Sequence, residues 1–155
     1  MKKLYPLLSV LLLIVGCSKD PINYETKLVE RDGIFYTKDT NKPYSGPVFS
    51  LYEDGKKKNE GIIEDGKVDG LFTTWYDNGQ KKEEETFKDG ERDGLWNTWF
   101  NNGQKRFEGN YKDGKENGLS TSWYRSGQWS VKRTWKDGKV ISVKSYYDEF
   151  GSVKE

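Results

Sequence analysis

The chain has 155 residues, with 26 basic and 25 acidic side chains, no histidine and one cysteine. The near-zero net charge argues against a nucleic-acid binder, which usually carries a strong excess of basic residues. Without histidine the chain lacks the commonest general base and metal ligand, and a single cysteine excludes an intrachain disulfide or a cysteine-rich zinc site. Only 33% of the residues are hydrophobic but 15% are aromatic, which predicts ordered structure with a thin apolar interior.

The first 16 residues have the layout of a secretory signal peptide. Met1-Lys2-Lys3 supplies positive charge, and a mostly apolar stretch from Leu4 to Val15 follows it. This stretch is too short to span a bilayer comfortably. It ends in Leu13-Ile14-Val15-Gly16-Cys17, in which a small residue stands directly before the lone cysteine.

This ending resembles the bacterial lipoprotein signal. The resemblance implies cleavage before Cys17, whose thiol and new amino group would both carry lipid. Because more than one acyl chain gives stable anchoring, we expect Cys17 to hold the protein at a membrane, followed by a polar tether that completes residues 17–30. The expected location is the cell envelope, on the periplasmic or surface side of the outer membrane if the bacterium has two membranes. The alternative is an uncleaved signal anchor with an ordinary cysteine.

Residues 31–155 are dominated by a unit of 24 residues. Such a period predicts one supersecondary unit stacked in a row, with any function on a repeated surface rather than in a single pocket. We expect full repeats at 46–69, 70–93, 94–117 and 118–141, with partial repeats at 31–45 and 142–155 as caps. Glycines mark the first position and two turn positions of each repeat: Gly46, Gly70, Gly94 and Gly118; Gly55, Gly79, Gly103 and Gly127; Gly66, Gly90, Gly114 and Gly138.

The second repeat illustrates the structure expected of each unit. The segment from Leu71 to Tyr76 is β-branched and aromatic, which predicts a strand, and Lys81 to Lys88 is the return strand. Asn78-Gly79 is a strong signal for a two-residue hairpin turn, and Asp89-Gly90 forms a second tight turn. The predicted fold is all-β: an elongated single antiparallel meander of β-hairpins, with no helix outside the signal peptide.

The glycine at the first position of each repeat has a predicted role. A two-residue turn at Asn78-Gly79 pairs Gly70 with Phe87, and we expect the aromatic ring to cover the glycine backbone. Gly94→Val should therefore destabilise the array more than Thr98→Val. Aromatic residues at equivalent positions are expected to stack beside their counterparts two strands away.

The charged clusters are interpreted as surface. Glu83-Glu84-Glu85 predicts a solvated strand rather than a catalytic carboxylate pair. The Asp-Gly runs that begin at Asp65, Asp89 and Asp113 predict turns rather than calcium loops. Lys56-Lys57-Lys58 predicts a solvated strand edge beside acidic neighbours rather than a phosphate site. We expect no catalytic residues, metal or cofactor.

The segment from Gly94 to Gly118 shows the repeat best, as an aromatic pair, an Asn-Gly turn and a Lys-Asp-Gly turn. It resembles the bacterial variant of the MORN repeat. The likeness covers about residues 31–151 and is similar to a family often labelled YwqK-type antitoxins. The resemblance implies a β-hairpin array that serves as a protein- or lipid-contacting scaffold, and it brings no catalytic residue set.

The predicted function is that of a membrane-anchored, non-enzymatic lipoprotein that binds a protein partner. Its candidate binding surface is the repeated aromatic pair: Trp75, Tyr76, Trp99, Phe100, Trp123 and Tyr124. One alternative is a cell-wall glycan or lipid binder that stacks its ligand on the three tryptophans, and exposed indoles would favour it. Another is an antitoxin-like protein that neutralises a toxin, and a third is a hydrolase.

Overall fold

The computed structural model describes residues 19–145. The predicted signal peptide, the predicted lipidation site Cys17 and the segment 146–155 lie outside these residues. Within the described range, no helix has the length and apolar character needed to cross a membrane.

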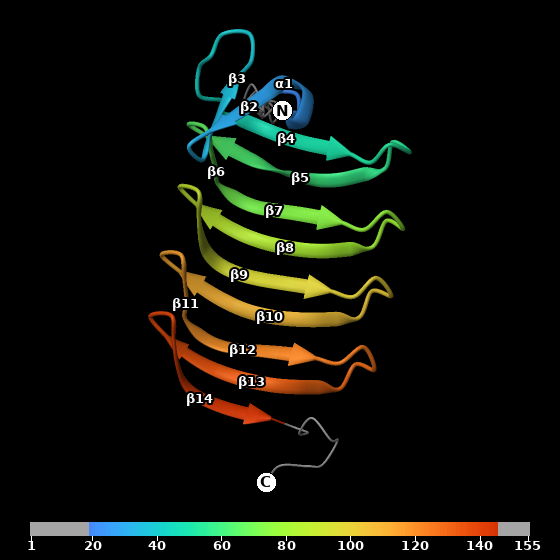
Figure 1. The fold of residues 1–155 in the computed structure, drawn as a ribbon, viewed down its shortest axis with the longest axis vertical. Helices are drawn as coiled ribbons and strands as arrows, with labels where there is room; N and C mark the ends of the chain where they lie inside the picture. Colours follow the sequence, from blue (N-terminus) through green and yellow to red (C-terminus); the bar gives the residue numbers. More distant parts are fainter. Residues whose placement is uncertain (1–18, 146–155) are drawn as a thin grey trace, which may run out of the picture.

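The predicted all-β meander is confirmed. From β4 to β14 the strands pair antiparallel in one long sheet whose order follows the order along the chain, with the two-residue strands β6 and β11 paired only to β5 and β10 (Figure 1). A short parallel pairing adds β1 beside β4, and β2 and β3 form a separate hairpin. The elements are β1 (Ile22–Asn23), α1 (Tyr24–Lys27), β2 (Leu28–Arg31), β3 (Ile34–Thr37), β4 (Gly46–Leu51), β5 (Lys57–Glu64), β6 (Lys67–Val68), β7 (Gly70–Trp75), β8 (Lys81–Lys88), β9 (Glu91–Trp99), β10 (Lys105–Lys112), β11 (Lys115–Glu116), β12 (Gly118–Trp123), β13 (Trp129–Lys136) and β14 (Lys139–Ser145).

The Asp-Gly turns lie along one long edge of the sheet, which we call the turn edge (Figure 1). In each of them both residues have positive φ, for example 51° at Asp89 and 83° at Gly90. Lys88 pairs with Glu91, so the turn has two residues and the type I′ conformation that such hairpins favour. Aspartate and glycine are the residues that tolerate this backbone most readily.

The Asn-Gly loops lie along the opposite edge, the loop edge, and here the predicted two-residue turn is wrong. Asn78 does not have a positive φ; only Gly79 does, at 84°. The Gly79 N–H donates to the Tyr76 carbonyl at 2.9 Å, and the Tyr76 N–H donates to the Gln80 carbonyl at 2.8 Å. These bonds define a three-residue loop, a type I turn followed by a bulged glycine, and the same pair of bonds recurs in the other three repeats.

The predicted pairing of Gly70 with Phe87 nevertheless holds. The three-residue loop places Trp75 opposite Lys81, and a bulge at Lys82 then shifts the register by one residue, so that Thr74 lies opposite Glu83. The two irregularities cancel over the rest of the hairpin. The equivalent glycine-to-apolar pairs form in the other repeats, as Gly46 with Ile63, Gly94 with Tyr111 and Gly118 with Trp135.

At none of the four first-position glycines does the cross-strand partner residue cover the glycine, so the predicted reason for it is wrong. A Cβ atom on Gly70 would meet no atom within 4 Å, and one on Gly94 would meet Thr86 rather than Tyr111. What these positions share is a positive φ, 81° at Gly70 and 126° at Gly94. There the backbone bulges away from the preceding hairpin, in a conformation that favours glycine. Rings do cover a different glycine, Gly61, where a Cβ would lie 2.3 Å from Phe72.

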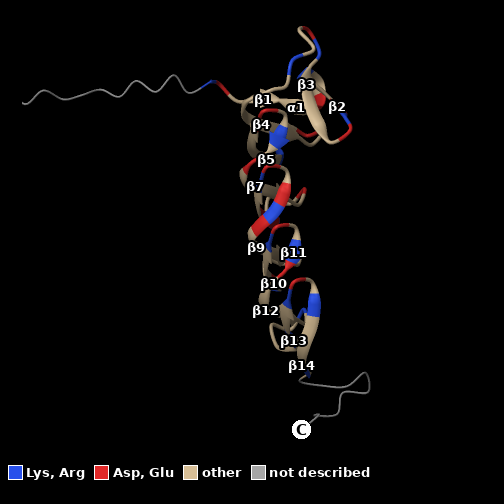
Figure 2. Ribbon diagram, turned by 90° about the vertical axis from the view of Figure 1, so that its left-hand side faces the viewer, with Lys and Arg blue, Asp and Glu red and all other residues tan. Residues whose placement is uncertain are grey.

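The N-terminal elements β1, α1, β2 and β3 together are called the N-terminal cap: β1 extends the sheet beyond β4, and α1, β2 and β3 lie on one side of the sheet beside its first strands (Figure 2). Leu28, at 4% exposure, packs in the same cluster as Val48 and Ile63, both at 1%. The predicted tether is therefore wrong for residues 22–30, because their apolar side chains bury against the first repeat. Within residues 19–145, the prediction of no helix is wrong at the four residues of α1.

Successive repeats are bonded to each other at both edges. At the turn edge the later repeat donates: the Gly114 N–H bonds the Arg92 carbonyl at 2.9 Å, and the Asp113 N–H bonds the Asp93 carboxylate at 3.3 Å. At the loop edge the earlier repeat donates: the Tyr76 hydroxyl bonds the Trp99 carbonyl at 2.8 Å. The backbone bond at the turn edge recurs at every junction between full repeats, whereas the hydroxyl bond at the loop edge forms only from Tyr52 and Tyr76, because the third repeat has Phe100 at this position.

Candidate protein-binding surface

The sheet has two faces with different environments, because side chains alternate along each strand. The face that the N-terminal cap covers in the first repeat is called the capped face, and it carries Val48, Ile63 and, further along, Trp96 and Phe107. The other is called the open face and carries Leu71, Thr73 and Trp75. The adjacent aromatic residues of each repeat therefore diverge: the tryptophans belong to the open face and Tyr76 and Phe100 to the capped face.

On the open face, tryptophan and lysine alternate in a Trp–Lys ladder. Lys81 lies opposite Trp75 in register, and its Nζ lies 5.7 Å from the centroid of the Trp99 ring. Lys57 and Lys105 cover Trp75 and Trp123 in the same way, at 5.2 Å and 5.7 Å. Each lysine also forms an ion pair with the glutamate three residues later: Glu60, Glu84 and Glu108.

The predicted stacking of each aromatic on its counterpart is therefore wrong for the tryptophans, since a lysine stands between them. Trp75, Trp99 and Trp123 are all half-buried rather than exposed. The most exposed apolar side chains of this face are instead the leucines at the second position of the repeat, Leu71 at 50%, Leu95 at 56% and Leu119 at 58%.

On the capped face, beyond the reach of the N-terminal cap, six aromatic residues contribute to the lining of an open groove of about 510 Å³, among them Trp99 and Trp123. We call it the aromatic groove; its lining includes Tyr76, Trp96, Phe100 and Phe107. The Trp96 ring lies 4.8 Å from Phe107 and 5.7 Å from Tyr111, so the floor is a packed aromatic cluster. Polar and charged side chains surround it: Lys82, Glu83, Thr98, Arg106, Glu116 and Ser122.

The glutamate run in the second repeat was predicted to be a solvated strand, and this prediction is wrong. Glu83 and Glu85 lie two residues apart on the capped face and interact with each other. Glu83 accepts a hydrogen bond from the Trp96 indole at 2.5 Å, and Glu85 forms an ion pair with Arg92. Burial raises the pKa of Glu85, the Arg92 guanidinium opposes this shift, and the neighbouring Glu83 adds to it. The Arg92 guanidinium in turn lies 4.6 Å from the centroid of the Trp96 ring. The two carboxylates thus hold the aromatic floor in place.

The lysine run in the first repeat lies beside acidic neighbours, as predicted. Lys56 pairs with Asp54 at 2.7 Å, Lys58 with Glu25 at 2.9 Å, and Lys57 with Glu60. The Asp-Gly runs are turns, as their positive φ values show. Among residues 19–145, no three acidic, cysteine or histidine side chains are grouped so that they could hold a metal ion.

The structure distributes the predicted surface residues over both faces and adds residues that the sequence interpretation missed. Trp75, Trp99 and Trp123 each lie beside a lysine. Tyr76 and Phe100 line the aromatic groove, and Trp99 and Trp123 also contribute to its lining. Tyr124 is 42% exposed at the end of the array. The missed residues are Trp96, Phe107 and Arg106 of the groove. The sequence did contain a signal for Trp96: it stands two residues before Thr98, so alternation along the strand places both side chains on the face that carries the groove.

No curated protein matches the chain significantly. Two segments do match a family model, that of the MORN repeat variant: residues 68–89 and 92–113. They start 24 residues apart and include the β7–β8 and β9–β10 hairpins that form much of the aromatic groove. The middle of the array therefore consists of two adjacent repeats of the MORN variant type.

Proposed function

We propose that this protein is a membrane-anchored lipoprotein whose repeat array binds a protein partner without catalysing a reaction, and that the partner lies on the aromatic groove. The anchor is the lipid on Cys17, inferred from the signal-like sequence before it. The repeats supply the binding surface.

One observation supports this proposal above the others: the chain's own N-terminal cap already covers the equivalent surface of the first repeat. Tyr24 and Phe35, whose rings lie 6.2 Å apart, pack against the cluster that contains Val48 and Ile63. In the third repeat the equivalent surface holds Trp96 and Phe107 and is open. Because one polypeptide segment fits this face of the array, a segment of a partner is the occupant whose chemistry the face suits best.

The geometry gives less support to glycan binding through the tryptophans. A sugar ring stacks on an accessible aromatic face, and a lysine lies over each of Trp75, Trp99 and Trp123. The antitoxin alternative is a special case of protein binding, and no feature of the described residues selects a toxin as the partner.

Site-specific photo-crosslinking in intact cells tests the proposal. A photoreactive phenylalanine analogue at Phe107, in the aromatic groove, should capture one dominant protein. The matched control carries the analogue at Leu95, on the open face of the same repeat, and should capture little. Equal capture from both positions, or capture of glycan or lipid alone from Phe107, would contradict the proposal.

The anchor has a separate test. Cys17→Ser should release the protein from the membrane fraction. Continued membrane association of this variant would refute the lipid anchor without bearing on the groove.

A further inference from the structure

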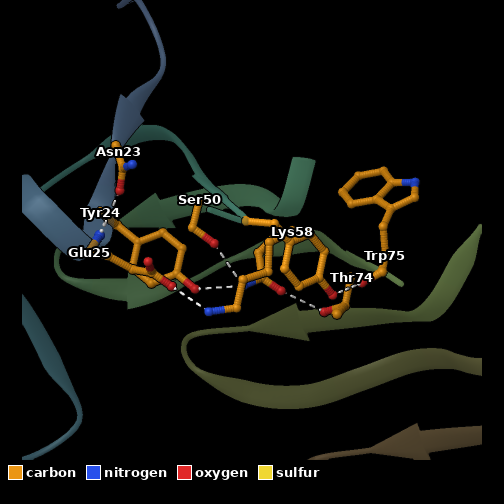
Figure 3. Close-up of polar contacts among 9 residues, drawn as sticks. Asn23, Tyr24, Glu25, Ser50, Lys58, Thr74 and Trp75 are labelled. Atoms are coloured by element: carbon orange, nitrogen blue, oxygen red, sulfur yellow. Dashed lines mark hydrogen bonds and ion pairs between the residues drawn. The ribbon is translucent and has the colours of Figure 1, made fainter. Parts of the chain in front are cut away.

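The N-terminal cap contacts the first repeat through a tyrosine and the glutamate that follows it (Figure 3). The Tyr24 hydroxyl accepts a hydrogen bond from the Asn59 amide at 2.9 Å, and the Glu25 carboxylate pairs with Lys58 at 2.9 Å. Asn59 itself is fixed by Ser50 and Thr74, both at 2.9 Å. The aromatic side chain thus covers the capped face while the carboxylate reaches a cation at the loop edge.

The cation that Glu25 contacts occupies the thirteenth position of its repeat, and the third repeat has Arg106 there. Arg106 is exposed, lines the aromatic groove and lies 5.9 Å from the centroid of the Phe100 ring. A second guanidinium, that of Arg125, lies 5.2 Å from the same centroid and donates to the Asn101 amide oxygen at 2.8 Å. Within the described part of the chain, no carboxylate forms an ion pair with either arginine.

The charge at the loop edge changes sign along the array. The eighth position of successive repeats is Glu53, Asp77, Asn101 and Arg125. The third repeat is thus the first in which the loop has no acidic residue to lie beside the cation at the thirteenth position. The two carboxylates that line the groove do not neutralise this end, since Glu83 accepts from Trp96 and Glu116 belongs to β11 at the turn edge.

We infer that Arg106 and Arg125, on either side of Phe100, bind a carboxylate of the partner. The partner places an aromatic residue and an adjacent acidic residue in the aromatic groove, as Tyr24 and Glu25 of the N-terminal cap do on the first repeat. This inference rests on the proposed function and specifies the partner's chemistry. It also fixes an orientation, in which the acidic residue lies at the loop edge and the aromatic residue over Trp96 and Phe107.

The chain's own sequence supplies a probe. A synthetic peptide of residues 19–31 is titrated into the ¹⁵N-labelled full chain, purified in detergent, while the Nε–Hε resonances of the arginines and the indole resonance of Trp96 are followed. A second peptide carries Glu25→Gln and a third carries Tyr24→Ala. We expect the parent peptide to bind about two- to five-fold more tightly than the glutamine peptide, as befits an exposed ion pair, and the alanine peptide to lose the shift at Trp96.

Matched variants of the protein separate the two proposals. Arg106→Gln should abolish the difference between the parent and glutamine peptides, whereas Arg31→Gln should preserve it, because Arg31 lies in the cap and donates to Asn41. If both peptides bind the groove equally, the carboxylate site is refuted while a peptide-binding groove stands. If no peptide shifts Trp96, the groove itself is refuted as the contact surface.

Discussion

The glycine at the first position of each repeat can be tested by comparing two substitutions that differ in one respect. Gly70 and Gly94 both have positive φ, 81° and 126°, but a Cβ atom on Gly70 would meet nothing within 4 Å, whereas one on Gly94 would lie 2.9 Å from the Thr86 Cβ. Gly70→Ala therefore measures the backbone cost alone. Gly94→Ala adds a collision with a β-branched side chain that cannot rotate its Cβ away.

The magnitudes follow from these distances. Positive φ costs an alanine about 1–2 kcal/mol, and the less flexible unfolded chain returns about 0.4–1 kcal/mol, so Gly70→Ala should lower the free energy of unfolding by about 0.5–1.5 kcal/mol. The added contact at Gly94 is a case of overpacking worth about 1–3 kcal/mol, which brings Gly94→Ala to about 2–4 kcal/mol.

Urea denaturation followed by tryptophan fluorescence measures both values, provided that the two variants keep the slope of the parent chain. Thr98→Val serves as the control, because Thr98 lies in the same strand as Gly94 but does not have a positive φ. Its free energy of unfolding should stay within about 0.5 kcal/mol of that of the parent chain. The reasoning fails if Gly94→Ala is no more destabilising than Gly70→Ala, or if both match the control.

Three further predictions concern contacts that recur along the array. Asp93→Ala removes the acceptor of the Asp113 N–H and should cost about 1 kcal/mol, whereas Asp93→Asn keeps an acceptor and should cost less; equal losses by urea denaturation would show that the bond contributes nothing. Lys81→Ala uncovers one face of Trp99 and breaks the pair with Glu84, so acrylamide should quench tryptophan fluorescence more strongly than in Lys88→Ala, and unchanged quenching would contradict the ladder. Burial raises the pKa of Glu116 above its ordinary value of 4.5, so the charged carboxylate disfavours the folded state. The stability of the parent chain relative to Glu116→Gln should therefore rise as pH falls through the raised pKa toward 4.5. A flat or opposite pH dependence would refute the shift.

Much of the fold could be predicted because the repeat presents the same turn residues every 24 positions. The pairing of Gly70 with Phe87 was predicted from the wrong turn, since the three-residue loop and the bulge at Lys82 shift the register by equal amounts in opposite directions. A sequence pattern shows only the sum of two such shifts. The folding of residues 22–30 into the cap was missed for a different reason: β1 and β2 have two and four residues, too few for alternation to be recognised.

The candidate site was predicted less well than the fold. Alternation along β8 could have placed Glu83 and Glu85 together, and the constant spacing of Lys81 and Glu84 could have indicated the Trp–Lys ladder. The openness of the groove could not have been predicted, because it depends on where the N-terminal cap ends over the sheet. That boundary is set by contacts of Tyr24 and Leu28 with the first repeat, which no local pattern encodes.

The stacking of the repeats in a single row has a mechanical consequence. The second and third repeats, for example, are joined at the turn edge by the Gly114 N–H, which donates to the Arg92 carbonyl, and at the loop edge by the Tyr76 hydroxyl, which donates to the Trp99 carbonyl. Because each repeat pairs only with its neighbours in the row, a pull along the long axis of the sheet should open one junction at a time and peel the array from an end. Every repeat released adds 24 residues, or roughly 80 Å of extended chain at about 3.4 Å per residue. Held by lipid at one end and by a partner at the other, such an array would lengthen in equal steps under tension and would absorb work before either attachment gives way.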